Sequence, residues 1–142
     1  MKTIRNATFF VLVSVALIMT LAGCGSRIDI KAELGQQFYL FFGNTVEIKG
    51  ERLEITFAEI LEDSRCPSDV VCVWDGRVRC RLDVNYRGSH YEVILTQPGL
   101  SNDYESGTFE DYRLSFVIEP YPLSGVTLSA KDYFINLTVF NN

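Results

Sequence analysis

Hydrophobic and polar residues alternate along most of the chain after residue 36. In a β-strand, successive side chains point to opposite faces, so strict alternation is typical of a strand with one buried side. The predicted inward side chains are Phe38, Leu40 and Phe42; Val46 and Ile48; Leu53, Ile55 and Phe57; Tyr91, Val93 and Leu95; Tyr112, Leu114, Phe116 and Ile118; and Tyr133, Ile135, Leu137 and Val139.

Turn residues interrupt this alternation at short intervals, for example at Pro98-Gly99 and Ser124-Gly125. The apolar repeat of a helix is absent after residue 36, except for a possible turn near residues 58–61. The pattern predicts an all-β fold over residues 36–142, a single antiparallel sandwich or small barrel of about seven to nine strands. Residues 98–111 are predicted to form one long acidic loop.

The segment Glu62–Leu82 carries three of the four cysteines, the only tryptophan and the clearest turn signal. Asp75-Gly76 favours a two-residue hairpin, because both positions of such a turn need positive φ. A two-residue turn fixes which residues lie opposite one another. The predicted pairs are Trp74 with Arg77, Cys72 with Arg79, and Val71 with Cys80.

This register places Cys72 and Cys80 on opposite faces, so we expect a Cys66–Cys72 disulfide. Cys80 falls among apolar residues and is expected to be a free thiol buried in the core. A three-residue turn would instead bring Cys72 opposite Cys80. A metal site is the other alternative, but the cysteine spacings lack the C-x-x-C pair typical of zinc.

The first residues have a different character. Lys2 and Arg5 precede an apolar run, residues 9–21, which ends in Leu-Ala-Gly-Cys24. This resembles the signal peptide and lipobox of bacterial lipoproteins. The resemblance implies cleavage of residues 1–23, lipid on Cys24 and a tether at residues 24–35. A transmembrane anchor is the alternative, although the run is shorter than the roughly 20 residues of a span.

The resemblance places the protein in the bacterial envelope, and Gly25 after the cysteine favours the outer membrane if the source is Gram-negative, otherwise the cell membrane. Residues 1–23 contain two basic and no acidic residues, so their removal changes the net charge from −5 to −7. An acidic chain is a poor nucleic-acid binder, because phosphate contacts need clustered Lys and Arg. The remaining residues are enough for one domain.

The motif D-S-R-C-P-x4-C-x-W-x-G runs from Asp63 to Gly76. It resembles a signature of small, largely uncharacterised bacterial envelope lipoproteins. The likeness extends to the lipobox and to the Pro-x-Pro and strand pattern between Pro120 and Leu137. It implies location and fold, and it brings no activity with it.

Few residues suit catalysis. His90 is the only histidine, on the polar side of a predicted strand. Glu62 and Asp63 are adjacent, so in a strand they would point to opposite faces and could not share acid–base work. We expect Asp63 to accept hydrogen bonds from loop amides or to pair with Arg65. We predict no catalytic residue, no metal and no cofactor.

Arg77, Arg79 and Arg81 share the polar face of the predicted hairpin with Trp74. Trp and Arg often dominate binding hot spots, so these four residues are the candidate binding face, with an unknown acidic protein or glycan as partner. Three like charges on one strand repel, and either acidic neighbours or an anionic partner must balance them. The charges could also serve only to discourage edge pairing.

The sequence thus predicts a lipid-anchored envelope protein that acts as a non-catalytic binding or structural module. One alternative is an inhibitor of an envelope or secreted protease, in which the preorganised Cys66–Cys72 loop enters the protease cleft. A second alternative is a metal-dependent or hydrolytic enzyme that uses His90 or the cysteines.

Overall fold

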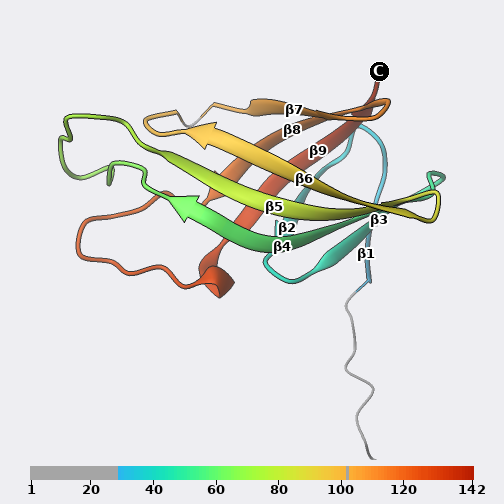
Figure 1. The fold of residues 1–142 in the computed structure, drawn as a ribbon, viewed down its shortest axis with the longest axis horizontal. Coiled ribbons are helices and arrows are strands. Elements are labelled where there is room, and N and C mark those ends of the chain that lie inside the picture. Colours follow the sequence, from blue (N-terminus) through green and yellow to red (C-terminus); the bar gives the residue numbers. More distant parts are fainter. Residues whose placement is uncertain (1–28, 102) are drawn as a thin grey trace, which may run out of the picture.

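The computed structural model describes residues 29–101 and 103–142. Figure 1 shows their strands packed as two layers. The predicted signal peptide and Cys24 lie outside the described residues. The strands are β1 (Asp29–Ala32), β2 (Gln37–Phe41), β3 (Thr45–Ile48), β4 (Leu53–Asp63), β5 (Arg77–Tyr86), β6 (Ser89–Pro98), β7 (Glu105–Phe109), β8 (Tyr112–Glu119) and β9 (Phe134–Asn141), with a short 3₁₀ helix, η1 (Ala130–Asp132), before β9.

The two layers are a five-stranded sheet in the order β1-β3-β4-β5-β6 and a four-stranded sheet in the order β2-β9-β8-β7. Neighbouring strands are antiparallel except for β1 and β3, which run parallel. The prediction of an all-β sandwich is therefore confirmed, with nine strands in the described part of the chain.

The core lies between the sheets and contains the side chains predicted to face inward. Phe57 and Phe116, one from each sheet, are the largest fully buried side chains. Only Phe42, Tyr91 and Val93 are partly exposed, and these pack against the core. Alternation therefore identified the buried face of the strands correctly.

The fold begins earlier than predicted. Residues 29–32 form β1, whose backbone pairs with β3, and Ala32 is only 1% exposed. The boundary expected at residue 36 is thus wrong, because a strand at the edge of the five-stranded sheet occupies part of the predicted tether. The stretch linking Cys24 to the fold is correspondingly shorter.

The stretch near residues 58–61 contains bulges of β4, not a helical turn. The register shifts between Phe57 and Glu59 and again between Ile60 and Glu62. Each bulge adds one residue and reverses the alternation. As a result, Glu59 and Glu62 lie opposite Arg81 and Arg79 on the outer face, whereas Asp63 lies opposite the buried Val78.

Two further expectations are wrong. The region 98–111 contains β7 and is not one long loop. The hairpin at Asp75-Gly76 does not form either, because β5 pairs with β4 and not with residues 71–74. Val71, predicted to lie opposite the buried Cys80, is 100% exposed, and Val73 is 97% exposed.

Candidate functional site

Residues 64–76 connect β4 to β5, and we call them the cystine loop. Figure 1 shows this loop at the same end of the sandwich as the β8–β9 connection, residues 120–133. The predicted Cys66–Cys72 disulfide closes it internally. At its base, the Ser64 amide donates to the Arg77 carbonyl at 2.8 Å and the Cys66 amide donates to the Asp75 carbonyl at 3.0 Å.

Two glycines allow the base of the loop to pack tightly. Gly76 has a φ of +69°, and a Cβ there would lie 1.8 Å from the Ser64 carbonyl oxygen. A Cβ on Gly99 would lie 1.8 Å from the Asp75 carbonyl oxygen. The Gly99 amide donates to the Gly76 carbonyl at 2.9 Å. A larger residue at Gly76 would force the two sides of the loop base apart, and one at Gly99 would push the loop base away from the end of β6.

Arg65 anchors the loop to the other sheet. Its guanidinium, with a side chain 0% exposed, binds both carboxylate oxygens of Asp63 at 2.9 and 2.7 Å. It also donates to the carbonyls of Ile118 and Pro120, each at 2.9 Å, and lies 4.9 Å from the centre of the Tyr121 ring. A buried charge is tolerated only when paired and hydrogen-bonded in this way.

Asp63 has a second partner in this cluster. The Tyr133 hydroxyl donates to its Oδ2 at 2.8 Å. Burial, the larger cause, and the hydrogen bond to Asp63 together raise the pKa of Tyr133 to about 12. The expectation that Asp63 pairs with Arg65 and accepts a loop amide is confirmed, since the Arg65 amide lies 3.3 Å from Oδ1. Asp63 therefore has a structural role.

Gln97 also supports this end and was missed in the sequence. β7 pairs with β8 only as far as Phe116, so the amide and carbonyl of Ile118 have no partner on that side. The Ile118 amide donates to Gln97 Oε1 at 2.7 Å, and its carbonyl accepts from Arg65. Buried backbone groups need such partners. The sequence did offer a sign of this role, because Gln97 is a polar residue two positions after Leu95 and so lies on the inward face of the same strand.

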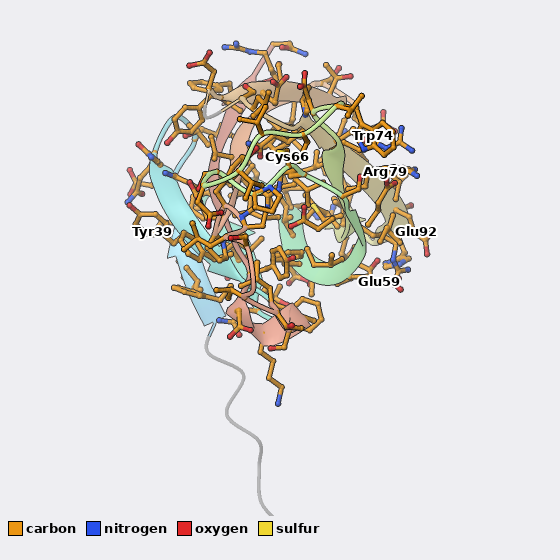
Figure 2. The ribbon with its side chains drawn as sticks, turned by 90° about the vertical axis from the view of Figure 1, so that its left-hand side faces the viewer. Tyr39, Glu59, Cys66, Trp74, Arg79 and Glu92 are labelled. Atoms are coloured by element: carbon orange, nitrogen blue, oxygen red, sulfur yellow. A yellow bond between two sulfur atoms is a disulfide. The ribbon has the colours of Figure 1, made fainter. Side chains whose placement is uncertain are left out.

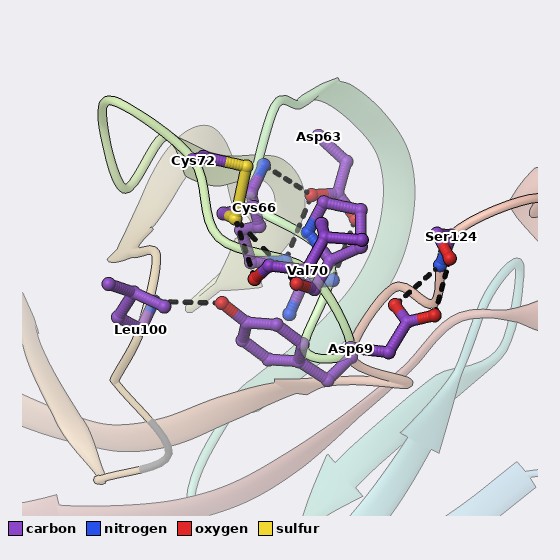
Figure 3. Close-up of a disulfide and its surroundings, with 10 residues drawn as sticks. Asp63, Cys66, Asp69, Val70, Cys72, Leu100 and Ser124 are labelled. Atoms are coloured by element: carbon purple, nitrogen blue, oxygen red, sulfur yellow. Dashed lines mark hydrogen bonds and ion pairs between the residues drawn. A yellow bond between two sulfur atoms is a disulfide. The ribbon is translucent and has the colours of Figure 1, made fainter.

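The cystine loop is also tied to the neighbouring connections, as Figure 3 shows. The Ser68 amide donates to the Pro122 carbonyl at 3.1 Å, and the Asp69 carboxylate accepts the Ser124 amide at 2.8 Å and its hydroxyl. The two hydrogen bonds from Ser124 lower the pKa of the Asp69 carboxylate, and the bond from the hydroxyl has the larger effect. The loop is thus held at its base and along one flank.

The tip of the loop carries apolar side chains in water. Val71, Val73 and Trp74 are 100%, 97% and 74% exposed. Beside them is a hollow of about 170 Å³, walled by the disulfide, Val70, Trp74 and Leu100. Large exposed apolar groups gathered on one surface are typical of interaction sites. Because the loop base is fixed, the tip is displayed in a defined arrangement.

The predicted arginine face is partly as expected. Arg77, Arg79 and Arg81 lie on the outer side of β5, but Trp74 lies in the loop and not on the strand. Acidic neighbours balance the stripe. Arg77 pairs with Glu62 at 3.2 Å, and Arg81 pairs with Glu92, Glu59 and Asp83 at 2.7, 3.4 and 3.4 Å. Binding of a partner by this face stays a prediction.

Glu62 and Asp63 point apart, as expected. Glu62 accepts from the Ser64 hydroxyl at 2.9 Å and pairs with Arg77, and the Ser64 bond is the largest cause of its lowered pKa. Asp63 instead faces the buried Arg65.

Cys80 and His90 occupy contrasting places. Cys80 is a free thiol, 0% exposed, and burial raises its pKa to about 12. His90 is exposed on the edge strand β6, where Asn85 is its register partner. Among residues 29–101 and 103–142, no group of three or more His, Cys, Asp or Glu side chains could hold a metal ion.

A larger hollow of about 260 Å³ lies around the β3–β4 turn and the β5–β6 hairpin, with Glu47, Glu51 and Arg52 in its wall. None of the predicted site residues lines it.

No protein family, curated protein or solved structure matches this chain. In the part of the chain that the structure describes, no helix has the length and apolar character needed to cross a membrane.

Proposed function

We propose that the protein is a lipid-anchored bacterial envelope protein that acts as a non-catalytic binding module. The anchor is proposed from the sequence alone, since the apolar run at residues 9–21 leads directly into Leu-Ala-Gly-Cys24. Several acyl chains on one residue would hold the protein firmly, at roughly 0.8 kcal/mol for each buried CH₂ group. The intact mass of protein from its own membranes tests this: Cys24→Ser should abolish the lipid mass and release the protein.

The recognition element in this proposal is the tip of the cystine loop. The observation that carries it is the exposure of Val71, Val73 and Trp74 on a loop fixed by a disulfide and by the buried Arg65. Exposed apolar side chains cost free energy in water, and a fixed backbone lowers the entropy lost on binding. Both features favour a site that becomes covered by a partner.

The partner in this proposal is a protein. The hollow beside Trp74 has about 170 Å³, less than the roughly 300 Å³ at the lower end of small-molecule pockets. It is large enough for a single apolar side chain. Trp74 and the valines would surround that side chain and exclude water, as residues around a hot spot do.

Photocrosslinking in the native envelope tests this proposal. A photoreactive amino acid replaces Val71 in the full chain, and a matched variant carries it at Ile94, which is 42% exposed on the outer face of β6. We expect one discrete protein adduct at position 71 and none at position 94. The same adducts at both positions, or none at position 71, would contradict the proposal.

A second variant separates the loop's shape from its chemistry. Cys66→Ser with Cys72→Ser leaves the tip side chains unchanged but releases the loop. We expect the adduct at position 71 to fall at least about tenfold, because each side chain that must be reordered costs roughly 0.5–1.5 kcal/mol. An unchanged yield would show that the disulfide does not preorganise the site.

The protease inhibitor is a second candidate, favoured by the exposed run of residues 71–74 on a braced loop. Such a run could occupy a protease cleft without being reordered. A panel of serine, cysteine and metalloproteases assayed with the full chain and with Val71→Asp tests it: inhibition that the substitution removes supports the candidate, and no inhibition of any member counts against it.

A further inference from the structure

A second exposed apolar surface lies on the outer face of the four-stranded sheet. It consists of Tyr39 and Phe41 on β2, 56% and 50% exposed, and Phe134 on β9, and we call it the aromatic edge. Figure 2 shows Tyr39 on the opposite side of the molecule from Trp74 and Arg79. The aromatic edge is therefore separate from the tip of the cystine loop.

The packing of its rings indicates what kind of partner it suits. The Phe134 ring lies 5.7 Å from that of Tyr39 and 5.5 Å from that of Phe41, at interplanar angles of 76° and 41°. Rings at these angles form an apolar ridge and do not share one flat face. A planar ligand such as a sugar ring would stack on only one of them, whereas a deformable apolar medium could contact all three.

The start of the fold lies beside this ridge. Asp29, the first residue of β1, is the register partner of Thr45. The preceding residue, Asn44, donates its amide to the Phe41 carbonyl at 3.0 Å. Asp29, where the chain enters the fold, is therefore linked to Phe41 by one strand pair, one peptide bond and one hydrogen bond.

Few residues separate this point from the proposed lipid. Five residue steps join Cys24 to Asp29, and a fully extended chain of that length spans at most about 17 Å. For comparison, the ten residues of β5 extend over roughly 33 Å. A tether this short keeps the side of the sandwich that carries β1 and β2 close to the membrane.

We propose that the aromatic edge lies in the headgroup region of the membrane to which the lipid on Cys24 attaches. This inference rests on the proposed lipid anchor. Aromatic side chains favour the membrane interface, because the rings are apolar and a tyrosine hydroxyl can still reach water. With the aromatic edge in the headgroups, Trp74 on the opposite side faces away from the lipid and stays accessible to a partner.

The neighbouring charges limit the size of the contact. Glu119 on β8 is the register partner of Phe134, on the side away from β2. A carboxylate is costly in an apolar medium, so the contact should end at β9. The basic Lys131 in η1 precedes Phe134 by three residues and is exposed.

Tryptophan fluorescence can test the proposal in the full-length protein, because the chain has one native tryptophan. Lipidated protein is reconstituted into phosphatidylcholine vesicles whose acyl chains carry bromine, a contact quencher. The wild type reports on Trp74. Phe41→Trp and, as a matched control on the far sheet, Ile94→Trp are each made with Trp74→Phe and report on their own positions.

We expect quenching at position 41 to be at least twofold stronger than at positions 74 and 94. Equal quenching at the three positions in vesicle-bound protein overturns the proposal but leaves the anchor intact. A blue shift at position 41 without quenching also overturns it, and indicates that a second copy covers the edge. Protein that lacks the lipid mass and does not float with vesicles overturns the anchor itself, and this inference with it.

Discussion

The cystine loop and the strand that follows it distribute polar and apolar residues in opposite ways. β5 buries Val78, Cys80 and Leu82 and places its arginines on the outer face, where Arg77 is exposed and Arg79 and Arg81 are half-buried. The cystine loop buries Arg65 and exposes Val71, Val73 and Trp74. In β5 the side chains follow the hydrophobic effect, and the surface ion pairs contribute little, typically 0–1 kcal/mol each.

In the cystine loop the same rule is reversed, and a network of hydrogen bonds makes this possible. The buried guanidinium is satisfied by Asp63 and by two carbonyls of the β8 end. The exposed tip is therefore carried on a base that buried hydrogen bonds hold in place. The proposed recognition role of the loop rests on this contrast.

The largest expected effect comes from breaking the buried anchor. Arg65→Ala should lower the free energy of unfolding by about 3–5 kcal/mol, because it leaves the Asp63 carboxylate and two carbonyls without their partner. Urea unfolding of the purified protein measures this. Arg79→Ala on the outer side of β5 is the matched control and should change the free energy by less than about 0.5 kcal/mol. Similar losses for both variants would remove the distinction between the two regions.

A glycine pair tests how tightly the loop base is packed. Gly76 and Gly88 both have positive φ, +69° and +88°, but only a Cβ at Gly76 meets another atom within 4 Å. Gly88→Ala should cost about 1–2 kcal/mol for the backbone conformation alone. Gly76→Ala should cost clearly more, about 3 kcal/mol, in the same unfolding experiment. Equal costs would mean that the loop base gives way easily.

The buried side of β5 should show in the pH dependence of stability. Because the folded-state pKa of Cys80 is raised to about 12, the unfolded chain loses this thiol proton first as the pH rises. The stability that this thiol contributes is fully present below its unfolded pKa, near 8.5–9, and is lost as the pH rises towards 12. Between pH 9 and 10, wild-type protein should lose about 1 kcal/mol more than Cys80→Ala, whatever the baseline cost of that substitution. Parallel pH profiles would contradict the burial of this thiol.

The smallest effect on stability is expected at the tip. Trp74→Ala should change the free energy of unfolding by less than about 0.5 kcal/mol, because the side chain is 74% exposed. The same variant should abolish the photocrosslinked adduct at position 71. A loss of stability above 1 kcal/mol would instead show that Trp74 packs against the fold.

Much of the sandwich was predictable because alternation records which face of a strand is buried. The inward residues of β8 and β9 follow this pattern without interruption. β4 departs from it after Phe57, because two bulges reverse its parity and no local residue pattern marks them. The missed strand β1 is only four residues long and pairs through its backbone at a sheet edge.

For the site, local rules were half right about conformation and wrong about partners. Gly76 does have positive φ, as the turn signal indicated, but Asp75 does not. However, β5 pairs with the eleven-residue β4, which buries far more apolar surface than residues 71–74 could. The disulfide was predicted correctly, but from a hairpin register that does not form. The positions of Gln97 and Arg65 depend on where β8 loses its β7 partner. Both side chains bond to Ile118, which lies far from them in the chain, so sequence alternation carries no signal of these contacts.

Amide hydrogen exchange in the free protein tests most directly whether the cystine loop is fixed before it meets a partner. The amides of Cys66, Ser68 and Gly99 donate to Asp75, Pro122 and Gly76 at 3.0, 3.1 and 2.9 Å. If the loop is preorganised, these three amides exchange at least about 100-fold more slowly than in an unstructured chain, a free energy of opening of about 2.7 kcal/mol. Exchange at unstructured rates, while the amides of β5 stay protected, would show that the loop is not preformed and would contradict its role as a fixed recognition element.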